Sequence, residues 1–563
     1  MSFDDLCRRD RPNGNRKKRD RPNPIRLNQP ADPRPRAIAP GDLHRTDFAA
    51  GALVSPPERV WIRVAPALAA KPSTASEIPF DNSYARLPEG FFARVAPTPV
   101  RAPRLIRVNR ELALELGIDP DWLASTDGVQ VLAGNRVPEN AEPIAMAYAG
   151  HQFGVFVPQL GDGRAILLGE VVDRSGLRRD IHLKGSGRTP FSRGGDGRAW
   201  VGPVLREYVV SEAMAALGIP TTRALAAVTT GEEVMRETVL PGAVLTRVAA
   251  SHVRVGTFQF FASRGDDEAV RILADHVIAR HYREAAQAER PYRALLDAVI
   301  RAQAELIAQW LLVGFIHGVM NTDNMSIAGE TIDYGPCAFM DEYDPRTVFS
   351  SIDRFGRYAY ANQPNIALWN LTAFAQCLLS LLAEDEDHAI ADGEEALAAF
   401  APAFQNAYQA GLRRKVGFIT EQPGDAALGQ DLLNFMHDHR ADFTNTFRRL
   451  SDAAAGDESG FRALFGNDAE VSDWLSRWQQ RLEQDPAEKS ARAASMRAVN
   501  PAFIPRNHRV EAMISAAVEK EDFRPFEELL SVLAKPFEAQ PAFDHYTAPP
   551  EEHERVQATF CGT

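Results

Sequence analysis

Residues 317–335 read HGVMNTDNMSIAGETIDYG, and this stretch decides the fold class. Asn324 stands seven positions after His317, and Asp333 follows nine positions after Asn324. Asparagine and aspartate supply the oxygen ligands that Mg²⁺ uses when it bridges phosphates. A strongly periodic apolar segment, 293–316, comes directly before the stretch, so we predict that a buried helix leads into it. The pattern therefore indicates a loop that binds a metal ion and phosphates.

The same spacing occurs in the catalytic loop of protein kinases, where the metal-binding asparagine follows the histidine by seven positions and D-F-G supplies a second ligand. One position departs from that pattern. The kinase base would stand two positions after the histidine, and that position is Val319. Asp323, beside the metal-binding asparagine, is the nearest substitute. Because both metal ligands are kept while the base is absent, we expect a reaction other than ordinary transfer of the γ-phosphate.

Two glycine-rich segments precede this loop in a region that is rich in predicted strands. Gly161, Gly163 and Arg164 stand directly ahead of a predicted strand at 164–172, and a second segment, 185–197, reads GSGRTPFSRGGDG. Glycine lets backbone N–H groups approach phosphate oxygens closely. Taken alone, the sequence Gly-Asp-Gly is more typical of a tight hairpin turn than of a phosphate-binding loop.

Four further charged residues complete the candidate site. Lys184 ends a predicted strand, and Glu207 lies in a helix predicted at 203–218. A strand lysine paired with a helix glutamate holds nucleotide phosphates in kinase-like folds, although a surface ion pair of little consequence remains the alternative. Arg247 and Arg254 lie where the strands give way to helices, and their guanidinium groups can hold phosphate oxygens or form ion pairs between two lobes.

The order of elements predicts an α+β chain with a protein-kinase-like, two-lobed fold and family-specific extensions at both ends. Strands are predicted at 223–230 and 242–248, with a turn at 231–233 between them. We expect these segments: a disordered, basic, proline-rich arm (1–77), an N-terminal extension that packs on the core (78–150), a strand-rich nucleotide-binding lobe (151–250), a helical lobe (251–411) and a helical C-terminal extension (412–563). Helices are predicted at 109–117, 268–282, 293–316, 366–383, 394–411, 426–435, 470–484 and 509–519.

Composition excludes several classes of protein. The chain has 563 residues, with 63 Lys and Arg against 75 Asp and Glu, so its net charge is −12. Such a chain is a poor general nucleic-acid binder. The longest apolar runs suit buried helices better than membrane spans. Four cysteines without zinc-site spacing indicate free thiols in a reducing cytoplasm, and a monomer is our default expectation.

The sequence resembles the selenoprotein O family, whose members are protein adenylyltransferases with a pseudokinase fold. The resemblance runs from about residue 78 to the C-terminus and leaves out the basic arm. It rests on these strings: YAGHQFG (148–154), QLGDGRA (159–165), LKGSGRTPFSRGGDGRA (183–199), HGVMNTDNMSIAGETIDYGP (317–336), NQPNIALWNL (362–371), NPAFIPRNH (500–508) and the terminal TFCGT.

The resemblance implies that ATP binds in an inverted pose and that AMP passes to Ser, Thr or Tyr hydroxyls of proteins, with the chain itself as one candidate substrate, while pyrophosphate leaves. It implies that Asp323 is the proton acceptor, that Asn324 and Asp333 bind Mg²⁺ or Mn²⁺, and that Glu207 is the partner of the lysine. The nucleotide contacts that it implies are Gly161, Gly163, Arg164, Lys184, Asp196, Gly197, Arg247, Arg254 and Asp333.

Cys561 stands where some members of the family carry selenocysteine, which implies a possible redox role, for example through a disulfide. The candidate partners are Cys7, Cys337 and Cys377. None is convincing from sequence, so an unpaired thiol is our expectation. Two other functions stay open at this point: transfer of the γ-phosphate to a protein or small molecule, and nucleotide binding without turnover.

Overall fold

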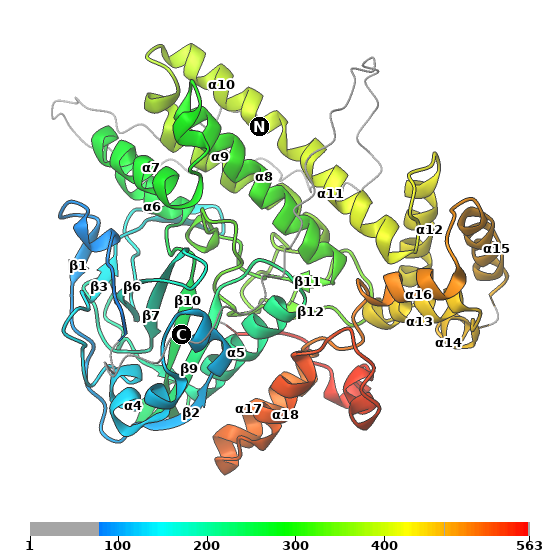
Figure 1. Cartoon of the computed structure of the whole chain (residues 1–563), viewed down its shortest axis with the longest axis horizontal. Coiled ribbons are helices and arrows are strands. Elements are labelled where there is room, and N and C mark those ends of the chain that lie inside the picture. The colour runs from blue at the N-terminus through cyan, green and yellow to red at the C-terminus, as the bar shows by residue number, and fades with distance from the viewer. Residues whose placement is uncertain (1–77, 467, 561–563) are drawn as a thin grey trace, which may run out of the picture. The chain divides into compact units, whose positions relative to one another are not determined.

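The computed structural model describes residues 78–466 and 468–560 (Figure 1). Strands concentrate between positions 92 and 249, and helices predominate after position 255. The chain is therefore of the mixed α+β class, with a strand-rich N-terminal region and a helical C-terminal region, as predicted. The arm at 1–77, Cys7 and Cys561 lie outside the described residues.

An antiparallel sheet of eight strands forms the N-terminal region. Seven strands follow the order β1-β3-β6-β7-β10-β9-β2, and β8 pairs with β10. The segment 78–150, which we expected to pack on the core as an extension, supplies three of these strands and is continuous with the sheet. The strands are β1 (Phe92–Arg94), β2 (Arg104–Val108), β3 (Ile144–Met146), β6 (Ala165–Val172), β7 (Arg178–Lys184), β8 (Ala199–Trp200), β9 (Arg223–Met235) and β10 (Val239–Ala249).

Alternation along the strands gives the sheet two different faces. Ile181 and Leu183 of β7 join a buried cluster with the short helices α2 (Arg110–Glu115), α3 (Pro120–Ala124) and α4 (Thr126–Leu132). Leu245 of β10 faces the other way and packs with α5 (Val201–Ala216). Because successive side chains of a strand point to opposite faces, Lys184 lies on the side of α5.

Helix α5 is also covered by the C-terminal extension. Helices α17 (Asn507–Lys520) and α18 (Arg524–Leu533) pack on it and share its hydrophobic cluster (Figure 1). Arg206 of α5 donates to the carbonyl of Cys337 at 3.1 Å and to Oδ1 of Asn507 at 3.2 Å. A single buried arginine thus ties this helix to the segment after Asp333 and to the start of α17.

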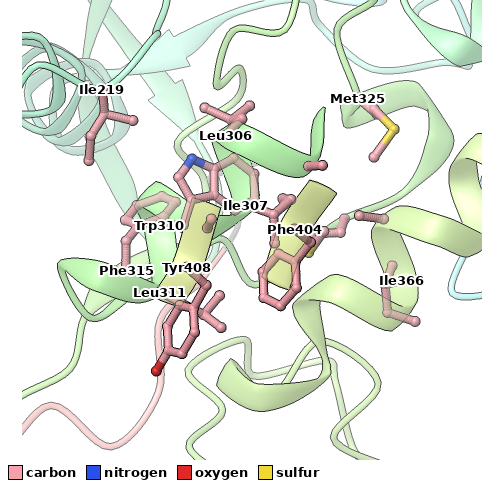
Figure 2. Packing of buried hydrophobic residues seen from close by; sticks show 14 of the residues in the cluster. Ile219, Leu306, Ile307, Trp310, Leu311, Phe315, Met325, Ile366, Phe404 and Tyr408 are labelled. Atoms are coloured by element: carbon pink, nitrogen blue, oxygen red, sulfur yellow. The ribbon is translucent and has the colours of Figure 1, made fainter. Parts of the chain in front are cut away.

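Buried apolar side chains of α8 (Pro291–Leu312) build the core under the 317–335 loop. Figure 2 shows Trp310 and Leu311 of α8 in one cluster with Phe404 and Tyr408 of α11. The Trp310 indole N–H donates to Oγ1 of Thr331 at 2.9 Å. The other helices are α6 (Val255–Ala262), α7 (Asp267–His281), α9 (Gln363–Leu382), α10 (Glu386–Ala398), α11 (Phe400–Lys415), α12 (Asp425–Asp438), α13 (Phe443–Ala455), α14 (Ser459–Arg462), α15 (Ala469–Glu483) and α16 (Lys489–Arg497).

One helical stretch in the described part of the chain, Tyr360–Leu382, is long and apolar enough to cross a membrane. It contains α9, and 56% of its most apolar window is buried. Helix α9 packs against α6, α8 and α10. These contacts agree with the buried helix that the sequence predicts here.

Three sequence predictions of local structure were wrong. No turn forms at 231–233, because Gly231 adopts φ +67° within a register irregularity and β9 continues to Met235. The helix predicted at 293–316 ends at Leu312, since Gly314 adopts φ +74° and 315–316 pair as β11 (Phe315–Ile316) with β12 (Ala338–Phe339). The predicted helix 394–411 spans parts of α10 and α11, which join at Ala399, because Pro402 in the first turn of α11 has no N–H to continue the hydrogen-bond ladder of α10.

Candidate active site

Four charged side chains meet between β7, β10, α5 and the 317–335 loop. Lys184 donates to Oε2 of Glu207 at 2.5 Å and to Oδ1 of Asp333 at 2.9 Å. Arg247 donates from Nε to Oε1 of Glu207 at 2.7 Å. The lysine and the helix glutamate that the sequence pairs are therefore in contact, and Arg247 and Asp333 join them. These four residues are called the charge cluster below.

Both carboxylates of the charge cluster are held ionised. Burial alone would raise the pKa of Glu207, but the charges of Arg247 and Lys184 lower it. Burial alone would also raise the pKa of Asp333, but Lys184, Arg247 and Arg164 hold this pKa far below its usual range. Arg164 thus lies near enough to act on the cluster. Asp333 also adopts φ +68°, a strained conformation for a residue other than glycine, which is typical of functional sites.

Asp323 lies in a short 3-10 turn, Thr322–Asn324, and is only 7% exposed. Its Oδ2 accepts a hydrogen bond from Nε2 of Gln152 at 3.2 Å, while its buried Oδ1 has no partner among the residues that the structure describes. Burial raises the pKa of this carboxyl from 3.8 to about 6. A Cβ at Gly150 would lie 2.5 Å from Oδ1, so only glycine leaves room for that oxygen. Asp323 is thus a carboxylate with one free acceptor oxygen.

Asn324 and Val319 share one hydrogen bond. The side-chain amide of Asn324 donates to the carbonyl of Val319 at 3.1 Å, which leaves the other side-chain atom, Oδ1, available as a ligand. Val319 itself is apolar and buried. Within 78–466 and 468–560, no group of three or more His, Cys, Asp or Glu side chains could hold a metal ion without other ligands. A cation held by Asn324 and Asp333 would need nucleotide phosphates to complete its shell, and this donor set suits Mg²⁺.

Arg254 connects the 317–335 loop to the glycine-rich part of the site. Its Nη1 donates to the backbone carbonyl of Asp323 at 3.2 Å. Its guanidinium stacks over the ring of Tyr148 at 4.3 Å and lies 3.6 Å from Oδ1 of Asp162. Arg254 is almost fully buried, so these contacts fix the place of its charge.

The first glycine loop (161–163) and the second glycine loop (185–197) pack against each other. Thr189 of the second loop donates from Oγ1 to the carbonyl of Asp162 at 2.6 Å. A Cβ at Gly161 would lie 2.4 Å from the ring of Phe191, and one at Gly163 would lie 2.9 Å from the carbonyl of Phe191. Side chains at either position would separate the two loops.

The last two predicted nucleotide contacts, Gly197 and Asp196, lie in the second glycine loop and differ in their exposure to solvent. Gly197 is buried with φ +69°, and its carbonyl accepts the N–H of Gly187 at 3.0 Å, so it closes the base of the loop. Asp196 is exposed and pairs with Arg236 at 2.8 Å. It also accepts the N–H of Arg198 at 2.9 Å. The structure therefore sets Asp196 apart from the charge cluster.

Sequence reasoning missed Gln152 and Tyr148, which contact Asp323 and Arg254. Both residues belong to the string YAGHQFG, which precedes the first glycine loop. The backbone around Gln152 is anchored as well, since His151 donates from its N–H to Oγ1 of Thr322 at 2.7 Å. The available signal was an unexplained polar pair, His-Gln, between two glycines.

Comparison with known proteins shows the family of the chain. A family described as "Protein adenylyltransferase SelO" matches residues 74–534. The chain is 69% identical over 487 residues to "Protein nucleotidyltransferase YdiU" of Rhodopseudomonas palustris (strain BisB5), which covers 86% of the chain and 99% of the relative. A protein of the same name from Bradyrhizobium sp. (strain BTAi1 / ATCC BAA-1182) is 68% identical over 486 residues, with the same two coverages. One from Methylorubrum populi (strain ATCC BAA-705 / NCIMB 13946 / BJ001) is 67% identical over 493 residues, again with these coverages. The chain therefore belongs to the protein adenylyltransferase SelO family.

Proposed function

We propose that this chain transfers AMP from ATP to Ser, Thr or Tyr hydroxyls of proteins at the site described above. The observation that carries the proposal is the environment of Asp323, a buried carboxylate with one free oxygen beside the charge cluster. The position of a kinase base, by contrast, holds the buried apolar side chain of Val319. Membership of an adenylyltransferase family supports AMP rather than the γ-phosphate as the transferred group.

The phosphates of ATP would lie between the two glycine loops and the charge cluster. Lys184, Arg247 and Arg254 would neutralise phosphate oxygens, and the backbone N–H groups of the first glycine loop would bind them. Asn324 and Asp333 would hold Mg²⁺ or Mn²⁺. When bound, such an ion would neutralise the negative charge that develops on the phosphates.

In the transfer step, the protein hydroxyl gives its proton to the carboxylate of Asp323. The hydroxyl oxygen then forms a bond to the α-phosphorus, and the bond from that phosphorus to the bridging oxygen of the β-phosphate breaks. Pyrophosphate leaves with the negative charge, and the arginine and lysine side chains stabilise it. The pKa of Asp323, about 6, suits a general base that acts near neutral pH.

The arrangement of these parts supports a kinase-like fold as the finer interpretation. β7 carries the lysine, α5 carries its glutamate partner, and the 317–335 loop carries the two ligands for the metal ion. Self-modification, a monomeric state and a cytoplasmic location stay predictions from sequence.

The test uses the full chain with ATP labelled on the α- or the γ-phosphate, in the presence of Mg²⁺ or Mn²⁺. We expect α-label on protein and label from the γ-position in pyrophosphate, and intact-mass spectrometry of the chain should show any added AMP. Transfer of γ-label to protein would overturn the proposal in favour of a kinase. Binding of ATP without transfer of either label would favour a non-catalytic nucleotide-binding protein.

A further inference from the structure

Asp162, the middle residue of the first glycine loop, turns its side chain inward and is 2% exposed. Its Oδ2 accepts the N–H of Met146 at 3.1 Å and lies 3.3 Å from Nε2 of His182. Its Oδ1 lies 3.6 Å from Nη2 of Arg254. Its backbone carbonyl accepts the hydroxyl of Thr189 from the second glycine loop. One buried residue therefore joins both glycine loops, β7 and Arg254.

Two buried histidine rings, tilted relative to each other, pack beside Asp162. The rings of His182 and His252 lie 4.1 Å apart, and both side chains are fully buried. Burial lowers the pKa of each, so both rings are neutral near neutral pH and do not repel each other. The charge of Asp162 is consequently balanced by Arg254, the cation that its carboxylate faces, rather than by an imidazolium.

His252 fixes Arg254 from the opposite side. The ring of His252 is anchored through Nδ1 to Oδ2 of Asp180 at 2.8 Å, and its backbone N–H donates to the same oxygen at 2.9 Å. The carbonyl of His252 accepts Nε of Arg254 at 3.3 Å. A buried guanidinium without a carboxylate partner is strongly unfavourable, so the position of Asp162 decides where this charge can stand.

We propose that Asp162 is a positioning residue for nucleotide transfer, which fixes the Arg254 guanidinium and the first glycine loop in the arrangement that receives the phosphates. It acts through these groups, since its own carboxylate is enclosed by protein. The inference rests on the proposed nucleotide site. It extends that site to Asp162, which neither motif spacing nor the family resemblance marked as a contact.

Asp162→Asn tests this role because it keeps the size of the side chain and removes its charge. With the amide oxygen in the place of Oδ2, asparagine can still accept from Met146 and from Nε2 of His182, while its NH₂ group replaces the oxygen that faces Arg254. Calorimetric titration of the full chain with ATP and Mg²⁺, together with KM and kcat for transfer, should show ATP binding weakened on the order of 10- to 100-fold, the usual effect of losing a partner behind a ligand-binding group.

A double-mutant cycle separates positioning from general destabilisation. If Asp162 acts through Arg254, then Asp162→Asn should weaken ATP binding far less in an Arg254→Met background than in the wild type. Asp425→Asn is the matched control, because Asp425 is a buried aspartate paired with Arg481 at 2.6 Å in the C-terminal helices. The control should lower the melting temperature and leave ATP affinity unchanged.

A second pair of variants covers the case in which Asp162→Asn does not fold. His182→Gln can still donate to Asp162 and should retain ATP affinity, whereas His182→Leu cannot and should lose it. A wild-type chain that binds no ATP would overturn the nucleotide site itself. If the wild type binds ATP but the effects of Asp162→Asn and Arg254→Met are fully additive, or His182→Leu binds as well as His182→Gln, the positioning role is wrong.

Discussion

The stability of Asp323→Asn relative to the wild type should rise with pH, although the substitution removes the proposed proton acceptor. Burial raises the pKa of Asp323 from 3.8 to about 6 in the folded chain. An acid whose pKa is raised by folding is ionised first in the unfolded chain. The wild type therefore loses stability as the pH rises from the pKa of Asp323 in the unfolded chain through its pKa in the folded chain. Asparagine does not ionise, so Asp323→Asn has no such loss.

The size of the effect follows from the shift. A difference of about two pKa units is worth about 3 kcal/mol once both states are ionised. Roughly half of this penalty is present near pH 5 and nearly all of it near pH 7.5, so the advantage of Asp323→Asn should grow by about 1 to 2 kcal/mol over that interval. The new amide group would occupy the place of Oδ1, where an unpaired buried donor costs about 1–3 kcal/mol at either pH. Only the change with pH is therefore diagnostic.

The assay is urea unfolding of both chains at the two pH values, with a chelator and without nucleotide. Asp162→Asn serves as the control of opposite sign. Burial opposes ionisation of Asp162, but His182 and Arg254 lower its pKa to about 2. The ionised carboxylate of Asp162 therefore stabilises the folded chain fully at any pH above the ordinary aspartate pKa, and this contribution stays constant between the two pH values of the assay. A difference between Asp323→Asn and wild type that stays flat, or shrinks toward neutral pH, would refute the reasoning. AMP transfer by Asp323→Asn should fall about 10²- to 10⁴-fold.

Four further changes test the site and the chain around it. Lys184→Ala should lower kcat/KM for AMP transfer about 10²- to 10³-fold with an unchanged circular dichroism spectrum, and an unfolded variant would make the lysine structural. Asp333→Ala should abolish transfer and weaken metal-dependent ATP binding in calorimetry; wild-type turnover would contradict its role. Val319→Asp should weaken ATP binding by adding negative charge near the phosphates, whereas a gain of γ-label transfer would favour a kinase. A chain that starts near Ser76 should keep its transfer activity and melting temperature, since the arm lacks apolar periodicity, and a clear drop in either would show that the arm packs on the rest.

Three side chains of the charge cluster could be identified from the sequence, whereas their contacts depend on tertiary packing. Alternation along β7 places Lys184 opposite Leu183, and the helix that follows brings Glu207 to that face. The spacing within the 317–335 loop likewise indicated Asp333, which the structure joins to the same lysine. The kinase-like pattern of a strand lysine, a helix glutamate and the loop spacing indicated these three side chains, although their chemical roles stay predictions.

The contacts of loop side chains and the burial of polar groups could not be predicted from strand alternation or motif spacing. Asp196 lies in a glycine-rich loop, whose backbone can take many conformations, and its carboxylate pairs with Arg236, forty positions away. The alternation on β7 also placed His182 on the lysine face, but its burial depends on Asp162 and His252, which only tertiary packing brings together. The residues next to each histidine in the sequence are equally typical of a histidine on the surface.

The helical extension was predicted in part. Helices at α12, α15 and α17 followed from apolar periodicity, while α13, α14, α16 and α18 were not identified. Three of those four are ten residues long or shorter, which leaves little periodicity to detect, and α14 has only four residues. The boundary predicted at 412 falls inside α11, whose C-terminal turn continues to Lys415.

The packing of α17 and α18 on α5 has a consequence for how the protein is made. Glu207 is carried by a helix whose outer face is covered by residues near position 530 and whose Arg206 is held by Asn507. On the ribosome, α5 emerges hundreds of residues before these partners exist. Its apolar face must therefore remain exposed, or be shielded by a chaperone, until α17 and α18 have been synthesised. A nascent chain that lacks these helices would not hold Glu207 in place, so nucleotide transfer would begin only after α17 and α18 have packed on α5.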